Sequence, residues 1–183
     1  MAYHSSAFLI PLLLFSFLFH SYALTPHLQV PDKVIDALCD EIVNPELCKT
    51  TLKNFTIKSQ VADRHELGVI TVLLATTQAR LTRNGFKEIL QNEKDDATKN
   101  YLLNCLNDYT VTLDKLRAAD LLSNQKDYKG MIKLVNEAVE MSRNCRDGFK
   151  NLPSHPSKAL EENYQKMVWL NDMALITLHV LGG

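Results

Sequence analysis

The sequence has no excess of charge of either sign and no hydrophobic run long enough to cross a membrane. Lysine and arginine total 20 against 21 aspartate and glutamate residues, a formal net charge of −1. This balance excludes the broad basic surface of nucleic-acid-binding proteins and argues against a polyanion as the direct partner. The longest largely apolar stretch, residues 7–19, falls short of the roughly 20 residues of a transmembrane helix. We therefore expect no nucleic-acid partner and no membrane span.

Motifs that carry catalytic or metal chemistry are also missing. The chain has no G-x-S-x-G, no phosphate-binding glycine loop, no EF-hand loop and no C-x-x-C pair, and His65-Glu66 lacks the second histidine of a zinc protease. Adjacent acids such as Asp95-Asp96 point apart on a helix, which disfavours a catalytic carboxylate pair. We therefore expect no catalytic residue, no metal site and no cofactor, and a protein that acts by binding.

What the sequence does have begins with a secretory signal. Residues 7–19 read AFLIPLLLFSFLF, and residues 21–23, Ser-Tyr-Ala, place small residues at the two positions that signal peptidase reads. A buried N-terminal helix is the alternative, but nothing amphipathic accompanies the run. We predict that residues 1–23 are removed and that residues 24–183 form one secreted domain. In that context the sequon at Asn54 predicts an exposed, glycosylated side chain.

Apolar residues recur at intervals of three and four, which is typical of helices, and strand-like alternation is nearly absent. The pattern predicts an all-α fold. We expect helices from residue 31, after residue 45, over residues 62–84, 96–122 and 127–149, and after the proline-bearing loop at 153–156. In the helix over residues 62–84 we expect Asn84-Gly85 to act as a stop or a kink, and these residues to face inward: Leu67, Ile70, Leu74 and Leu81.

The four cysteines define the expected topology. In a secreted chain they are disulfide candidates rather than metal ligands, and they are Cys39, Cys48, Cys105 and Cys145. Cys105 and Cys145 lie equally far from residue 125, the centre of a predicted turn, so the arms of an antiparallel helix pair bring them level. Cys39 and Cys48 straddle the helix break at Asn44-Pro45 in the same way. The expected pairing is Cys39–Cys48 and Cys105–Cys145.

These segments resemble the plant invertase/pectin methylesterase inhibitor family. The similar stretches are the hairpin that closes with Asn44-Pro45-Glu46-Leu47-Cys48, the helix with residues 101–109 (YLLNCLNDY), the partner helix that ends in residues 145–149 (CRDGF), and residues 171–178 (NDMALITL). The resemblance covers all of residues 24–183. It implies an antiparallel four-helix bundle with an N-terminal helical hairpin (residues 24–55) and two disulfides.

The resemblance also implies a stoichiometric protein inhibitor in the cell wall or apoplast, with the vacuole as a second compartment. One class of members seats the bundle over the cleft of pectin methylesterase. The other inserts part of the bundle into the active site of cell-wall or vacuolar acid invertase, often with a Pro-Lys-Phe segment. This chain has Lys126-Asp127-Tyr128 at that place, which favours pectin methylesterase as the partner and leaves acid invertase as the alternative.

We expect the contact surface on the solvent face of the helix pair joined by Cys105–Cys145. Esterase inhibitors commonly place acids after the third cysteine, where this chain has Asn107 and Val111, and a threonine before the fourth, where it has Asn144. The candidate interface residues are Asn107, Thr110, Asp114, Asn144 and Asp147. Two other functions stay open: a secreted bundle of the same fold without inhibitory activity, and a carrier of small apolar ligands.

Overall fold

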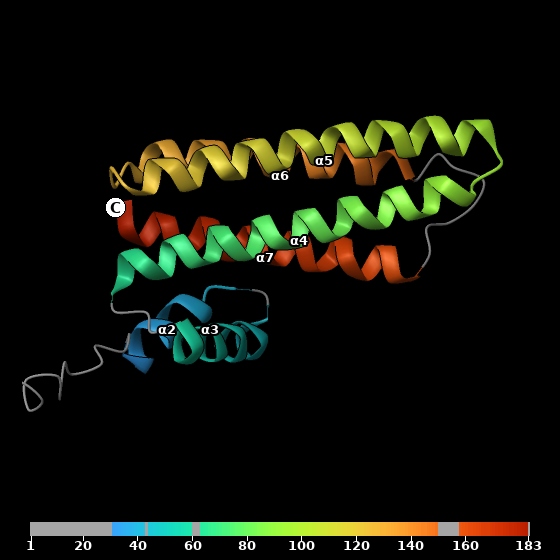
Figure 1. Cartoon of the computed structure of the whole chain (residues 1–183). Helices are drawn as coiled ribbons and strands as arrows, with labels where there is room; N and C mark the ends of the chain where they lie inside the picture. Colours follow the sequence, from blue (N-terminus) through green and yellow to red (C-terminus); the bar gives the residue numbers. More distant parts are fainter. Residues whose placement is uncertain (1–30, 43, 60–62, 150–157, 183) are drawn as a thin grey trace, which may run out of the picture.

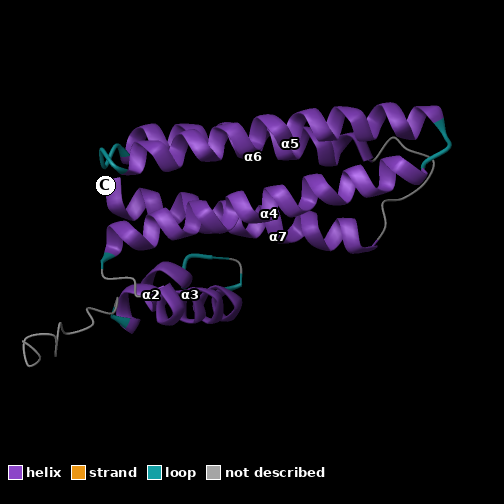
Figure 2. Cartoon of the chain, in the orientation of Figure 1, coloured by secondary structure: helices purple, strands orange, loops and turns teal. Residues whose placement is uncertain are grey.

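The computed structural model describes residues 31–42, 44–59, 63–149 and 158–182, and within them the chain is helical, without strands (Figure 2). The helices are α2 (Asp32–Cys39), α3 (Pro45–Ser59), α4 (Arg64–Asn92), α5 (Asp96–Ser123), α6 (Tyr128–Phe149) and α7 (Lys158–Gly182). The predicted signal peptide at residues 1–23 lies outside the described residues. None of the described helices is both long and apolar enough to span a membrane.

Short polar side chains begin most of the helices. Asp63 accepts a hydrogen bond from the Glu66 amide at 2.9 Å, and Asp95 accepts one from Thr98 at 2.7 Å. Asp127 and Asn44 do the same for α6 and α3. Each cap pairs one of the amides that a helix start leaves unbonded, which contributes about 1 kcal/mol. Local sequence therefore sets where α3, α4, α5 and α6 begin.

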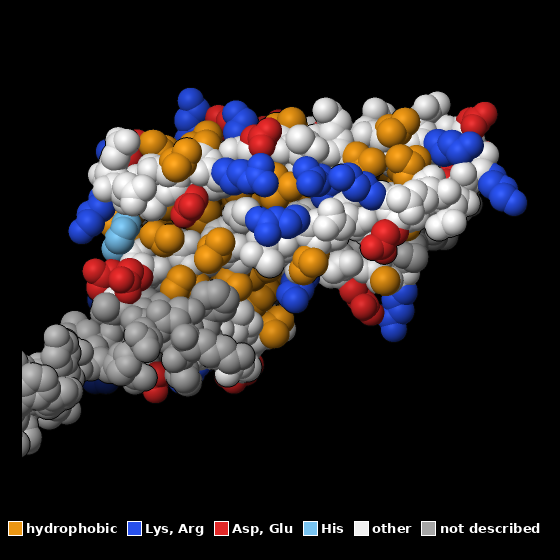
Figure 3. Space-filling view, viewed as in Figure 1, with side chains coloured by type: hydrophobic (Ala, Val, Ile, Leu, Met, Phe, Trp, Pro, Cys, Tyr) orange, Lys and Arg blue, Asp and Glu red, His pale blue; other side chains and the backbone are white. Residues whose placement is uncertain are grey.

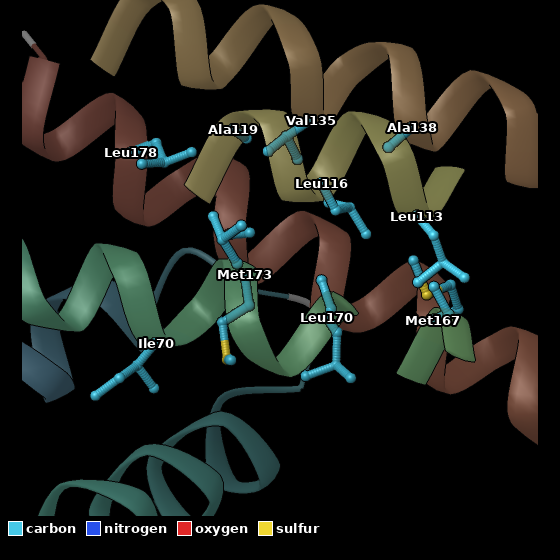
Figure 4. Packing of buried hydrophobic residues seen from close by; sticks show 14 of the residues in the cluster. Ile70, Leu113, Leu116, Ala119, Val135, Ala138, Met167, Leu170, Met173 and Leu178 are labelled. Carbon is cyan, nitrogen blue, oxygen red and sulfur yellow. The ribbon is translucent and has the colours of Figure 1, made fainter. Parts of the chain in front are cut away.

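Helices α4 to α7 form the predicted four-helix bundle, and α2 and α3 form a separate hairpin against it (Figure 1). The α5–α6 pair lies on one side, α4 and α7 lie beneath it, and the hairpin lies on the far side of α4 and α7. The bundle core is closed by apolar side chains from all four long helices (Figure 4). The labelled set is Ile70, Leu113, Leu116, Ala119, Val135, Ala138, Met167, Leu170, Met173 and Leu178.

The prediction for α4 was partly wrong. The helix passes through Asn84-Gly85 and ends at Asn92, because Phe86, 2% exposed, continues its buried face beyond the glycine. Leu67 and Ile70 are buried as expected, but Leu81 is 53% exposed. Small and polar residues occupy many of the other inward positions. Those residues are Thr71, Ala75, Thr76, Gln78, Ala79 and Thr82.

The two disulfides are Cys39–Cys48, which joins the region of α2 and α3, and Cys105–Cys145, which joins α5 and α6. No cysteine of the chain is free. In the hairpin, α3 runs to Ser59 and so extends past the expected boundary at residue 55. Ile35, Leu38 and Leu52 are buried between the hairpin helices and the bundle.

Candidate functional site

The Cys105–Cys145 bridge sits inside a tightly packed aromatic cluster. The Tyr101 hydroxyl donates a hydrogen bond to the backbone carbonyl of Cys145, and its ring lies 4.4 Å from the ring of Phe149. The same ring lies against Gly148, where an added Cβ would have no room. Burial raises the pKa of the Tyr101 hydroxyl. These contacts, together with the disulfide, hold the ends of α5 and α6 in one arrangement.

The five candidate interface residues are all exposed, as residues of a contact face must be. Asn107, Thr110 and Asp114 follow one another at spacings of three and four on α5, so they share one face of that helix. Asn144 and Asp147 occupy α6 next to the buried Cys145. That the two groups act together as one surface stays a prediction.

The two acids of this set lie beside arginines of their own chain. Asp114 is 3.4 Å from the Arg117 guanidinium, and Asp147 is 2.8 Å from that of Arg146. The hydrogen bond that Arg146 donates to Asp147 is the main cause of a raised pKa of Arg146. Its guanidinium also lies 5.3 Å from the centre of the Tyr164 ring. Exposed pairs of this kind partly cancel their charge. The face is therefore less acidic than its sequence suggests.

Lys and Arg side chains also gather over α4 and α5 on the face shown in Figure 3. Arg80 and Lys87 on α4 are exposed and have no ion pair among the described residues. The outer surface beside the candidate acids thus carries charges of both signs. Such a surface offers little long-range attraction to a basic partner, so close packing must supply most of any binding free energy.

Two exposed leucines extend the α5 face and were not singled out from the sequence. Leu103 is 51% exposed and Leu121 is 68% exposed. The two leucines lie at the ends of one stripe along α5, in which the spacing alternates between four and three residues. The stripe consists of Leu103, Asn107, Thr110, Asp114, Arg117 and Leu121. Both leucines lie off the apolar line of α5 in the sequence, and this position could have identified them as exposed. Apolar side chains of this kind are candidate contacts for a partner.

The segment Lys126-Asp127-Tyr128 is committed to the bundle itself. Asp127 caps α6, and Lys126 has a positive φ of 54°, the left-handed conformation of a tight turn. Tyr128 is half-buried, and its hydroxyl is 3.0 Å from Nδ1 of His65 on α4. Its Cβ would be 3.1 Å from a Cβ added to Gly182 at the end of α7. Tyr128 thus contacts His65 on α4 through its hydroxyl and lies close to the end of α7 through its Cβ.

Asn54 lies on α3 and is exposed, so a glycan could be attached there without disturbing the core. Across the described ranges, no group of three or more histidine, cysteine, aspartate or glutamate side chains could hold a metal ion. What the described geometry offers is a rigid outer face of polar and apolar side chains on α5 and α6. Such a face can recognise a macromolecular partner.

The family described as "Plant invertase/pectin methylesterase inhibitor" has a model that matches residues 33–179. A Platanus orientalis protein named "Putative invertase inhibitor" is 27% identical over 168 residues, with 88% of this chain and 98% of its own length covered. A Platanus acerifolia protein of the same name is 30% identical over 140 residues, with 76% and 77% covered.

Solved structures show the same fold. A mutant form A of a pectin methylesterase inhibitor from Arabidopsis has a TM-score of 0.68 at 24% identity, covering 79% of this chain and 95% of that chain. A pectin methylesterase inhibitor from Arabidopsis thaliana has a TM-score of 0.62 at 22% identity, covering 83% and 98%. The predicted helical bundle with its two disulfides is thus confirmed.

Proposed function

This chain belongs to the plant invertase/pectin methylesterase inhibitor family, and we propose that it is a secreted inhibitor of pectin methylesterase. It acts in the apoplast by seating its preformed α5–α6 face over the active-site cleft of the enzyme, in a reversible one-to-one complex. Neither protein is cleaved. Nothing in the comparisons supports a vacuolar location, and secretion rests on the predicted signal peptide at residues 1–23.

The observation that carries the choice of esterase is the position of Tyr128. An inhibitor that inserts this segment into a sucrose site needs an aromatic side chain that projects from the bundle. Here the Tyr128 hydroxyl is paired with His65, the ring lies edge-on to the His65 ring, and the Cβ lies close to Gly182 at the end of α7. Releasing it would break the hydrogen bond and expose a half-buried ring, which opposes insertion. The names of the Platanus relatives support acid invertase as the second candidate.

Rigidity of the α5–α6 face supports tight binding. The Cys105–Cys145 bridge and the Tyr101 contacts fix the pair before it meets a partner, so little conformational entropy is lost on docking. An interface of the usual size, about 1,600 Å² in total, is sufficient for a stable complex. Because Asp114 and Asp147 are paired with arginines, we expect the inhibition constant to depend only weakly on salt.

The function is tested by titrating purified protein, residues 24–183, into parallel assays of pectin methylesterase and acid invertase. We expect the esterase to lose activity linearly up to an equimolar ratio, while the invertase keeps its activity. Both proteins should migrate unchanged on a denaturing gel afterwards. Equimolar loss of invertase activity alone would establish the second candidate, and no effect on either enzyme would indicate a non-inhibitory bundle.

The contact face is tested by the charge reversals Asp114→Lys and Asp147→Lys. Each introduces a repulsive or misplaced charge at the proposed interface, and we expect the inhibition constant to rise about tenfold or more. Glu162→Lys on α7 is the matched control, because Glu162 is exposed and lies 3.7 Å from Lys158 of its own chain. Helical circular dichroism should be the same for all three. Inhibition constants within twofold of the parent for both reversals would exclude this face.

A further inference from the structure

A groove of about 480 Å³ opens at the seam between the hairpin and α7. Asn44 and Leu47 line it from the start of α3, and Val168, Trp169 and Asp172 line it from α7. The hairpin lies across α4 and α7 from the α5–α6 pair (Figure 1). The groove is therefore separate from the proposed inhibitory face, and its volume is in the range of small-molecule sites.

The floor of the groove is apolar and contains the one tryptophan of the chain. Leu47 is 47% exposed, although Ile35, Leu38 and Leu52 of the same hairpin are buried. Trp169 is half-buried and packs against the core on one side. A partly exposed indole beside an exposed leucine forms a flat apolar surface. Its hydration is unfavourable, so a ligand that displaces the water gains free energy.

The rim carries polar groups with unused hydrogen-bonding capacity. The side-chain oxygen of Asn44 accepts from the Leu47 amide at the start of α3, which leaves the side-chain nitrogen of Asn44 as a donor. The Gln165 nitrogen donates to Glu161 at 2.7 Å, which leaves its oxygen as an acceptor. Burial raises the pKa of the Asp172 carboxyl, and Arg143 opposes that shift. These groups suit a ligand with several hydroxyls.

One rim residue brings an uncompensated charge. Lys166 is exposed and has no ion pair among the described residues. A carboxylate that reaches the groove would gain a charge-assisted hydrogen bond there. The net charge of −1 disfavours a long polyanion spread over the surface, but a single ammonium beside an apolar platform accepts a single acidic unit.

We propose that this seam groove binds an acidic oligosaccharide, with one pyranose ring against Trp169 and one uronate carboxylate on Lys166. The C–H face of a pyranose is apolar and matches the indole, while its hydroxyls reach the amides and carboxyl of the rim. A purely apolar ligand would leave those rim groups without partners, which costs free energy. The groove differs in place and in ligand from the surface that meets the enzyme.

Such a ligand contacts the hairpin and the bundle together. Binding to a site that exists only when the hairpin is docked stabilises the docked state by linkage. Saturating acidic oligosaccharide should therefore raise the melting temperature of the chain. It should leave the inhibition of pectin methylesterase unchanged, because no residue of α5 or α6 lines the groove.

The test is a fluorescence titration of the full secreted chain with trigalacturonate, with maltotriose as the neutral sugar. Trp169 is the only tryptophan, so its emission reports directly on the groove. We expect a saturable change with trigalacturonate and at least about tenfold weaker binding of maltotriose. No saturable change with trigalacturonate, or equal affinity for the two sugars, overturns the proposal.

Variants separate the groove from general charge effects. Lys166→Ala should weaken trigalacturonate binding about tenfold, while Lys133→Ala, a matched exposed lysine on α6, should leave it unchanged. Trp169→Leu should abolish binding in calorimetry. N-acetyl-leucinamide serves as the apolar competitor, and its tighter binding would contradict a sugar site. An equal loss of trigalacturonate affinity in the two lysine variants would also contradict it. Lys166→Ala should inhibit pectin methylesterase as the parent does, so the groove and the proposed function are tested separately.

Discussion

The chain contains two pairs of helices closed by a disulfide, and they differ in how far each depends on the rest of the molecule. Cys39–Cys48 spans 9 residues in sequence and Cys105–Cys145 spans 40. All four cysteines are buried. The α5–α6 pair shares its core with α4 and α7, whereas the hairpin meets the bundle along a seam that leaves a groove beside Trp169.

This difference shows that one covalent device can serve two purposes. In the α5–α6 pair the bridge reinforces a packed arrangement that aromatic contacts of Tyr101 and Phe149 already hold. In the hairpin the bridge adds to the packing of Ile35, Leu38 and Leu52, because a short helix such as α2 (Asp32–Cys39) is not stable by itself. The bundle should therefore govern global stability, and the hairpin should respond more locally.

The largest effect should come from removing the two bridges one at a time. By loop-closure entropy, Cys105→Ala with Cys145→Ala should lower the free energy of unfolding by about 3.9 kcal/mol, and Cys39→Ala with Cys48→Ala by about 2.7 kcal/mol. Urea titrations followed by circular dichroism measure both. Equal losses from the two double variants would contradict the comparison.

Core truncations should show the same ranking with the bridges intact. Leu113 on α5 is fully buried and Ile35 on α2 is 1% exposed. Leu113→Ala should cost about 3 kcal/mol, and Ile35→Ala about 2 kcal/mol, near the lower end for buried aliphatic side chains. The hairpin can relax at its seam, so the cavity left there collapses more easily. A larger cost for Ile35→Ala in urea titrations would show that the hairpin is the better-packed unit.

The titration of Asp172 reports how far water is kept from the seam between the hairpin and α7. Its pKa is raised from the ordinary value of 3.8, mainly by burial, so the folded chain holds the proton more tightly than the unfolded chain. Stability must then fall as the pH rises from 3.8 through the folded-state pKa. Asp172→Asn should therefore stabilise the chain at pH 7, and this gain should shrink as the pH falls toward 3.8.

The measurement is the urea midpoint of Asp172→Asn and its parent at several values of pH, with Asp120→Asn as an exposed aspartate control on α5. A gain at Asp172 that stays constant with pH would mean that the carboxyl is not kept from water at the seam. The same gain in the control would point to a general charge effect.

The smallest effects should come from the ion pairs that join the helices of each unit. Lys115 on α5 is paired with Glu137 on α6 at 2.5 Å, and Lys49 on α3 with Asp40 at 2.9 Å. The bond to Lys115 lowers the pKa of Glu137, so its contribution is present above the ordinary value of 4.5 and is lost as the pH falls through the lower folded-state pKa.

Glu137→Gln and Lys49→Gln should therefore shift the urea midpoint less than the disulfide, core and Asp172 variants do, and high salt should remove the shift. The bond to Asp40 raises the pKa of Lys49, so its contribution is present below 10.5 and is lost as the pH rises through the higher folded-state pKa. A salt-resistant loss in either variant would show a packing role for that side chain.

The limits of prediction are clearest on α4 and α6. Apolar periodicity placed the starts of α4, α5 and α6 within two residues of those observed, but the choice of Leu81 as a core residue was wrong. Apolar periodicity favours large side chains, whereas α4 turns small and polar residues such as Ala75, Thr82 and Gln78 toward α7 and α5. Gln78 is tolerated there because its amide reaches the Asn163 side chain on α7 at 3.1 Å, a contact between residues far apart in the chain.

The sequence by itself determined the helices, their caps and the partners of the four cysteines, because these depend on residues that are near one another or symmetric about a turn. Only the tertiary structure decided that Tyr128 is held by His65 and that a groove opens beside Trp169. Both depend on how helices that are far apart in the chain come together, and the order of residues along one helix does not specify that.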